Sequence, residues 1–234
     1  MDRAAAAEQL TALLSLRNPP IALAFVDQPP EGIEPVSKPV PSACTFWREA
    51  ELGTFYAAAE RHFNCPVGSM VMGFELPSTV SERLGAMVQS MCDAGYLSMD
   101  EAAKIPTVDS DSAGIAYGPL HRFPLVPDLV VIWVNVAQAM LYSEAAGRAA
   151  WTGAPMGMTG RPGCAALPRA LQDSQPVMSL GCAGMRTFTE IGDDMNLAVI
   201  PGRVLAEFID ALSGKVAANA TMRSLYLAQK AAVG

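Results

Sequence analysis

Charge is scarce in this sequence, and positive charge is the scarcer sign. Only 17% of the 234 residues are charged, and 16 lysines and arginines stand against 23 acidic residues, for a formal net charge of -7. No run of lysines or arginines occurs. Because nucleic acids and anionic membrane surfaces are bound through clustered positive charge, we expect neither as a partner.

A long hydrophobic segment is also missing. The longest nearly apolar run, residues 129–141, is interrupted by Asn135 and Gln138, and it is shorter than the roughly 20 residues that cross a bilayer. The start, Met1-Asp2-Arg3, lacks the basic residues and apolar core of a secretory signal. We therefore expect a cytoplasmic protein, in which the five cysteines stay reduced.

Several common catalytic motifs are absent. The glycine-rich stretch 153–163 lacks the Lys-Ser/Thr ending of a phosphate-binding loop. No serine stands between glycines as in a nucleophile elbow. No two cysteines have the two-residue spacing of a metal-binding knuckle. A site in this chain must therefore be assembled by the fold from distant residues.

Hydrophobic patterning indicates a mixed α/β (α+β) fold, with a mixed sheet and flanking helices. Short apolar runs at 21–26, 115–118, 129–134, 176–180 and 196–201 predict strands, of which 129–134 is expected to be central because both of its faces are apolar. Helices are expected at 2–16, 78–95, 137–150 and 164–171, whereas residues 54–59 fit either a strand or a helix.

The length of 234 residues fits a single compact domain, 1–234, that ends in a helical segment, 202–232. Gly214 is expected to end or bend the helix that begins near Pro201. The high apolar content, 51%, is also compatible with a homo-oligomer.

Four cysteines lie beside glycine and proline, where the backbone turns sharply. They are Cys44, Cys65, Cys164 and Cys182, and the gaps between them are 21, 99 and 18 residues. The last stands in Gly181-Cys182-Ala183-Gly184, where glycines allow a sulfur or a backbone N–H group to approach a ligand closely.

Four thiolates can bind either a tetrahedral zinc ion or a [4Fe–4S] cluster. We favour the cluster, because glycine and proline turns leave backbone N–H groups near the sulfurs, and zinc is the alternative on the same ligands. The competing interpretation is that these cysteines are small buried hydrophobic residues at tight turns.

Three polar residues accompany the cysteines. His62 lies three residues before Cys65 and is a candidate metal ligand or a general base for that thiol. Arg161 and Arg186 each lie within four residues of a site cysteine and are candidates to bind an anionic substrate or to balance a thiolate cluster. For Arg186, an ordinary ion pair with Glu190, Asp193 or Asp194 explains the sequence equally well.

The remaining sulfur-containing residues and the second histidine are expected to be structural. Cys92 continues the apolar row of Leu84 and Val88 and is assigned to the core. Most of the thirteen methionines are assigned to the core as well, with Met156 and Met158 in the glycine-rich turn left open.

The proline-bounded strand 20–26, Cys44 followed by an aromatic residue, the segment 55–65 with His62, and the stretches 160–165 and 181–186 together resemble the family called domain of unknown function 169. The resemblance extends from about Leu13 to Pro201. It implies little about activity, because the family is uncharacterised. Its members are common in anaerobic bacteria and archaea, which would suit an oxygen-sensitive metal centre.

The leading hypothesis is a cytoplasmic metal or iron–sulfur protein that performs redox or Lewis-acid chemistry on a small, anionic molecule. The alternatives are a metal-free thiol enzyme, with Cys65 or Cys182 as nucleophile and His62 as base, and a non-catalytic module that binds a small ligand.

Overall fold

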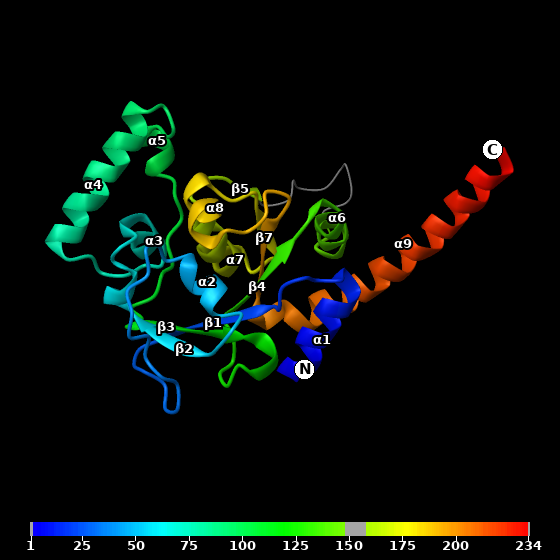
Figure 1. Ribbon diagram of the computed structural model, residues 1–234, viewed down its shortest axis with the longest axis horizontal. Helices are drawn as coiled ribbons and strands as arrows, with labels where there is room; N and C mark the ends of the chain where they lie inside the picture. Colours follow the sequence, from blue (N-terminus) through cyan, green and yellow to red (C-terminus); the bar gives the residue numbers. More distant parts are fainter. Residues whose placement is uncertain (1, 148–157, 234) are drawn as a thin grey trace.

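The computed structural model describes residues 2–147 and 158–233. Seven strands form one sheet in the order β2-β3-β1-β4-β7-β6-β5, with β4 at its centre (Figure 1). The strands are β1 Ile21–Val26, β2 Phe55–Ala58, β3 Gly114–Pro119, β4 Leu129–Val134, β5 Met158–Thr159, β6 Val177–Ser179 and β7 Asn196–Pro201. Neighbouring strands are antiparallel except β5 and β6, which pair in parallel. The sheet is thus mixed, as the sequence predicts.

Helices lie on both faces of this sheet. They are α1 Arg3–Leu14, α2 Thr45–Glu49, α3 Pro66–Val71, α4 Ser78–Asp93, α5 Met99–Ala102, α6 Val136–Ala145, α7 Ala166–Asp173, α8 Ala183–Thr189 and α9 Leu205–Val233. Four short 3-10 turns complete the described elements: η1 Ala59–His62, η2 Leu120–Arg122, η3 Gly163–Ala165 and η4 Gly202–Val204. Helices α4 and α5 lie to one side of the sheet, and the end of α9 projects on the opposite side (Figure 1).

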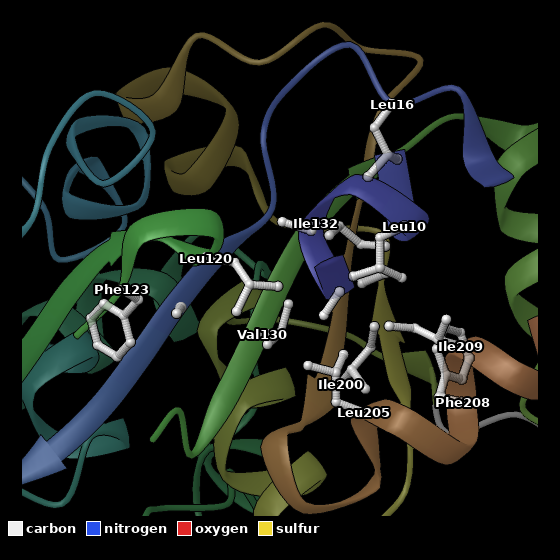
Figure 2. Packing of buried hydrophobic residues seen from close by; sticks show 14 of the residues in the cluster. Leu10, Leu16, Leu120, Phe123, Val130, Ile132, Ile200, Leu205, Phe208 and Ile209 are labelled. Atoms are coloured by element: carbon white, nitrogen blue, oxygen red, sulfur yellow. The ribbon is translucent and has the colours of Figure 1, made fainter. Parts of the chain in front are cut away.

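Side chains of the central strands point alternately to the two faces of the sheet and pack in two separate hydrophobic cores. In β4, Val130 and Ile132 face a cluster with helices α1, α6 and α9, of which Figure 2 shows a part. Val131 and Trp133 face the other cluster, which includes residues of α2, α7 and α8. Because successive side chains of a strand point to opposite faces, a strand that is apolar throughout must be covered on both sides.

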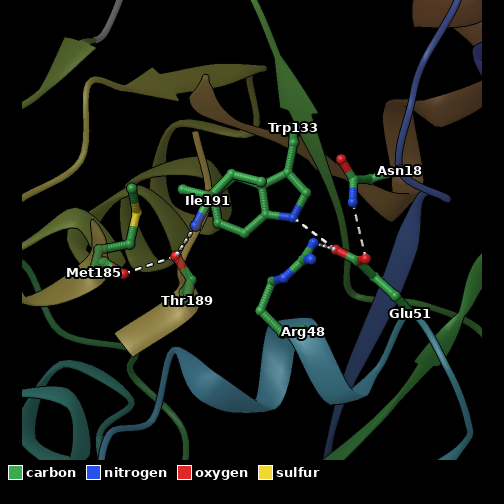
Figure 3. Close-up of polar contacts among 7 residues, drawn as sticks. All are labelled: Asn18, Arg48, Glu51, Trp133, Met185, Thr189 and Ile191. Carbon is green, nitrogen blue, oxygen red and sulfur yellow. Dashed lines mark hydrogen bonds and ion pairs between the residues drawn. The ribbon is translucent and has the colours of Figure 1, made fainter. Parts of the chain in front are cut away.

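The polar contacts of Glu51 fix α2 against the core that contains Val131 and Trp133, which we call the second core (Figure 3). Its carboxylate pairs with Arg48 and accepts hydrogen bonds from Trp133 Nε1 at 3.0 Å and from Asn18 Nδ2 at 3.0 Å. A charged group with three donors is well compensated for its partial burial. Helix α2 therefore has a defined position relative to strand β4.

The predicted C-terminal helical segment is present, but it does not end at Gly214. Helix α9 runs without interruption from Leu205 to Val233, through Gly214. A methyl group built at Gly214 would meet nothing within 4 Å, so neither packing nor a turn requires glycine there. Glycine costs a helix only about 1 kcal/mol relative to alanine, which the flanking helix formers offset.

Two other expectations need adjustment. Residues 54–59, which the pattern left open, contain strand β2. The part of the glycine-rich turn up to residue 157, with Met156, and the end of the predicted helix 137–150 lie outside the described residues, whereas Met158 of the same turn begins strand β5. Within the described ranges, no helix is both long and apolar enough to cross a membrane.

Candidate functional site

The four cysteines singled out in the sequence line a single cavity of about 320 Å³, on the face of the sheet that carries α2, α7 and α8. Each of them lies at or near the start of a helical element. Cys44 precedes α2, Cys65 precedes α3, Cys164 lies in η3 before α7, and Cys182 precedes α8. Four cysteines from segments far apart in the sequence therefore line one cavity near the amino ends of short helices.

Backbone N–H groups donate to two of these sulfurs. Gly68 N–H donates to Cys65 Sγ at 3.3 Å, and Met185 N–H donates to Cys182 Sγ at 3.3 Å. The thiols occupy the position that Ser or Asp usually takes at a helix start, where the first N–H groups have no partner within the helix. Such donors stabilise negative charge on sulfur.

Glycines bring the cysteine-bearing turns together in pairs. A Cβ atom at Gly68 would lie 2.9 Å from Ala43 Cβ, so α3 packs directly against the turn that carries Cys44. A Cβ atom at Gly163 would lie 3.3 Å from Gly181 Cα and 3.6 Å from the backbone nitrogen of Cys182. These close approaches need residues without side chains.

The two glycines beside Cys182 have different roles. Gly181 has φ +83°, and a Cβ atom there would lie 2.2 Å from Met185 Cε, so it permits the turn into α8. Gly184 lines the cavity, and a Cβ atom there would lie 4.0 Å from Cys182 Sγ. Of the pair expected to admit a ligand, only Gly184 borders the cavity.

Burial raises the pKa of the Cys44 thiol to about 11, and repulsion from Cys65 and Cys182 adds to this effect, although the hydroxyl of Ser42, 3.2 Å away, opposes it. Burial and the three neighbouring thiols raise the pKa of Cys164 well above its ordinary value as well. Two of the four thiols therefore stay protonated at neutral pH unless a cation accompanies them.

His62 occupies a different place from the one its spacing suggests. Its ring is buried between Phe46 and Phe74, with centroid distances of 4.9 Å and 4.8 Å, and it does not line the cavity. Nδ1 must donate to the Ala58 carbonyl at 3.0 Å, so Nε2 of the neutral ring accepts from the Tyr117 hydroxyl at 2.9 Å. Burial lowers the pKa of His62 to about 4.

The guanidinium group of Arg186 forms hydrogen bonds to backbone carbonyls. Its guanidinium donates to Leu180 O at 2.7 Å, Met195 O at 3.2 Å and Gly192 O at 3.3 Å. In the described part of the chain it forms no ion pair with the acids that follow α8. Instead, Arg186 connects the segment before Cys182 to the loop after α8. Thr189 fixes the end of α8: its hydroxyl donates to the Met185 carbonyl and accepts from the Ile191 N–H group (Figure 3).

Arg161 does line the cavity. Its guanidinium carbon lies 4.4 Å from the ring centroid of Tyr96, and Nη2 is 3.9 Å from Glu101 Oε1. Cys92, assigned to the core from its apolar row, is instead partly exposed on α4 and does not line the cavity. The reason is that α4 has one buried residue, Val80, and hence no core of its own to join.

The outer wall of the cavity includes residues that no motif in the sequence marks as part of a site. The apolar row of α4, Leu84, Met87, Val88 and Met91, faces the cysteines across the cavity. The three-and-four spacing predicts this apolar face, but it does not reveal what the face covers. Tyr117 is not marked by the sequence either, because the apolar pattern of its strand does not show that its hydroxyl contacts His62.

Comparison with known proteins places the chain in a family. Residues 9–211 match the family model described as DUF169, uncharacterised ArCR. No curated protein and no solved structure gives a match. Since the matched region includes every strand and all four cavity cysteines, the chain belongs to the DUF169 family.

Proposed function

We propose that Cys44, Cys65, Cys164 and Cys182 bind a metal centre, with a [4Fe–4S] cluster favoured over zinc, and that a small molecule binds beside it. One observation carries this proposal: four cysteines from four separate elements line the same cavity. Free thiols also suit the reducing cytoplasm, where we place the protein.

The spacing of the sulfurs bears on which centre they suit. In the described residues, no three His, Cys, Asp or Glu side chains form a group that would hold a single metal ion. A tetrahedral zinc with Zn–S bonds of about 2.3 Å needs sulfurs only about 3.8 Å apart. A four-iron cluster takes one thiolate on each of its irons and so accommodates a wider ring of sulfurs.

The residues present fit such a group in two further respects. Burial raises the pKa of the Cys44 and Cys164 thiols, so their ionisation as ligands would depend on the positive charge of a bound iron centre. The N–H donors to Cys65 and Cys182 tune a sulfur-ligated centre when it is bound. A bound cluster would supply electron transfer or a Lewis-acidic iron.

The thiol-enzyme alternative has weaker support. It requires His62 to accept a proton from Cys65 or Cys182, yet both ring nitrogens are bonded elsewhere and the imidazole is shielded from the cavity. A non-catalytic ligand-binding role remains the second candidate, because the cavity walls are largely apolar and suited to binding.

The test is metal analysis of protein purified without oxygen and without a metal-binding tag. We expect about four irons and four acid-labile sulfides per chain, with visible absorption. Each of the variants Cys44→Ser, Cys65→Ser, Cys164→Ser and Cys182→Ser should lower the iron content several-fold.

Cys92→Ser is the matched control, because Cys92 lies on α4 outside the cavity. It should keep the wild-type iron content, and circular dichroism should show that all five variants are folded. Wild-type protein free of iron, zinc and sulfide would overturn the proposal, and so would a Cys92→Ser variant that loses as much iron as the others.

A further inference from the structure

The cavity is larger than its ring of sulfurs, and the wall opposite them is hydrocarbon. Leu84, Met87, Val88 and Met91 of α4 line this wall, and Phe188 of α8 also lines the cavity. The side chains of Met87 and Phe188 each remain 41% exposed. Apolar surface that a fold leaves open inside a concave site is stabilised when an apolar ligand displaces the water.

Methionine suits this wall because its unbranched thioether adapts to ligands of different shape. The whole cavity, about 320 Å³ without a metal centre, lies at the lower end of the range for small-molecule sites, so the space beside a bound centre suits only a small molecule. Walls contributed by α3, α4, α8 and η3 enclose the space on several sides. These features favour a small organic molecule over a peptide or protein segment.

Arg161 is the one charged residue among the described residues that line the cavity. It stacks on Tyr96, which keeps the guanidinium plane in place. Its acidic partner in the described chain, Glu101, is 3.9 Å away, and both side chains are exposed, at 41% and 58%. An exposed pair of this length contributes little to stability, so a ligand carboxylate can compete for the guanidinium.

We propose that the cavity binds an apolar organic acid, with its hydrocarbon part against the α4 wall and its anionic group at Arg161. This inference rests on the proposed function, because the organic acid is the small molecule that we place beside the metal centre. A single cation at an otherwise apolar site selects a ligand of the opposite charge. Arginine binds a carboxylate through two parallel N–H groups.

The experiment compares three probes with the same eight-carbon chain: octanoate, 1-octanol and octylamine. Binding is measured by calorimetric titration of the full chain. We expect octanoate to bind about tenfold more tightly than octanol, the gain of a charge-assisted hydrogen-bonded pair, and octylamine to bind most weakly.

Arg161→Gln should abolish the preference for octanoate while leaving octanol binding unchanged. Arg169→Gln is the matched control, because Arg169 pairs with Asp173 on α7 outside the cavity, and it should preserve the preference. Met87→Gln, a neutral polar substitution at a partly exposed position of the α4 wall, should weaken binding of octanoate and octanol alike.

Equal affinity for the three probes would overturn the inference, as would absence of binding. An Arg161→Gln variant with an unchanged preference would overturn it too. All titrations are made on samples with measured iron content, before and after iron removal by a chelator. Protein that contains no iron, zinc or sulfide as purified but prefers octanoate would contradict only the metal centre, whereas protein that contains iron and shows no preference before or after its removal would contradict only the ligand class.

Discussion

At the residue scale, His62 shows how a titratable group can be placed for structure rather than for chemistry. Its two nitrogens bind the Ala58 carbonyl and the Tyr117 hydroxyl, and its ring packs among aromatic side chains. Tyr117 in turn lies close enough to Cys164 and Cys44 for their charges to raise its pKa further, beyond the effect of burial. The histidine therefore holds Tyr117 in place, and Tyr117 lies near two of the cavity cysteines.

This placement predicts acid sensitivity of the metal-free protein. Burial lowers the pKa of His62 from 6.5 to about 4, so between these pH values the unfolded chain binds a proton at His62 that the folded chain does not bind. The stabilising contribution of the neutral ring is complete above pH 6.5 and is lost as the pH falls toward 4. By linkage it amounts to on the order of 3 kcal/mol.

Urea unfolding of the metal-free protein between pH 7 and 4 measures this loss. The variant His62→Gln carries a side chain that does not titrate, and its free energy of unfolding should fall less steeply over the same range. Identical pH profiles for the two proteins would show that His62 is already accessible to protons in the folded state.

At the scale of elements, the site depends on how closely short helices approach one another. Helix α3 packs closely against the turn of Cys44 because residue 68 is glycine, and the Cys164 turn lies close to the Cys182 turn at Gly163, where an added Cβ atom would lie 3.3 Å from Gly181 Cα. The helices themselves are too short to be stable alone, so their packing against the second core positions the sulfurs.

Gly68→Ala tests this arrangement. The added methyl group would lie 2.9 Å from both Ala43 Cβ and Cys65 Sγ, so α3 or the Cys65 side chain must shift. We expect a cost of about 1–3 kcal/mol in unfolding free energy and a several-fold loss of bound iron. Thermal unfolding and iron analysis of the same sample measure the two effects.

Gly85→Ala is the control within α4, where a methyl group would meet nothing within 4 Å. Because alanine favours the helix, this variant should be more stable by about 0.5–1 kcal/mol and should keep its iron. If Gly68→Ala behaves like Gly85→Ala, close packing at residue 68 does not position the sulfurs.

At the scale of the whole molecule, helix α9 has two parts. Its first turns, with Phe208, Ile209 and Leu212, are buried in the core beside α1, as Figure 2 shows for the first two. Farther along, Asn219 donates to Glu144 of α6 at 2.6 Å, after which residues 220–232 are exposed. The family match ends at residue 211, near the boundary between the two parts.

Truncation after Asn219 should therefore change the free energy of unfolding by less than about 1 kcal/mol, because exposed residues contribute little to stability. Leu212→Ala should cost about 2–5 kcal/mol, because Leu212 is fully buried. Chemical denaturation, together with the mass in solution, provides the comparison. A large loss of stability, or a change of oligomeric state on truncation, would show that the exposed turns pack against another molecule.

The sequence by itself determined most of the longer helices and strands and the four cysteines that are candidates for a site, but not the short helices α2, α3, α5 and α8. The doubly apolar run at β4 predicts the central strand, and the spacing in α4 predicts an amphipathic helix, because both patterns follow from the geometry of a single element. The glycine or proline near each of the four cavity cysteines marks a turn for the same local reason. The family resemblance, carried by these motifs, is confirmed by the match over residues 9–211.

Only the tertiary structure decided which of these residues meet. Cys65 and Cys164 are 99 positions apart, and no local pattern reports that their turns share a cavity with α4 as its outer wall. The same holds for the polar candidates: Arg161 borders the cavity, whereas Arg186 binds carbonyls and His62 turns to Tyr117. Long-range contacts such as these depend on how the whole sheet and its helices pack, whereas sequence periodicity describes one element at a time.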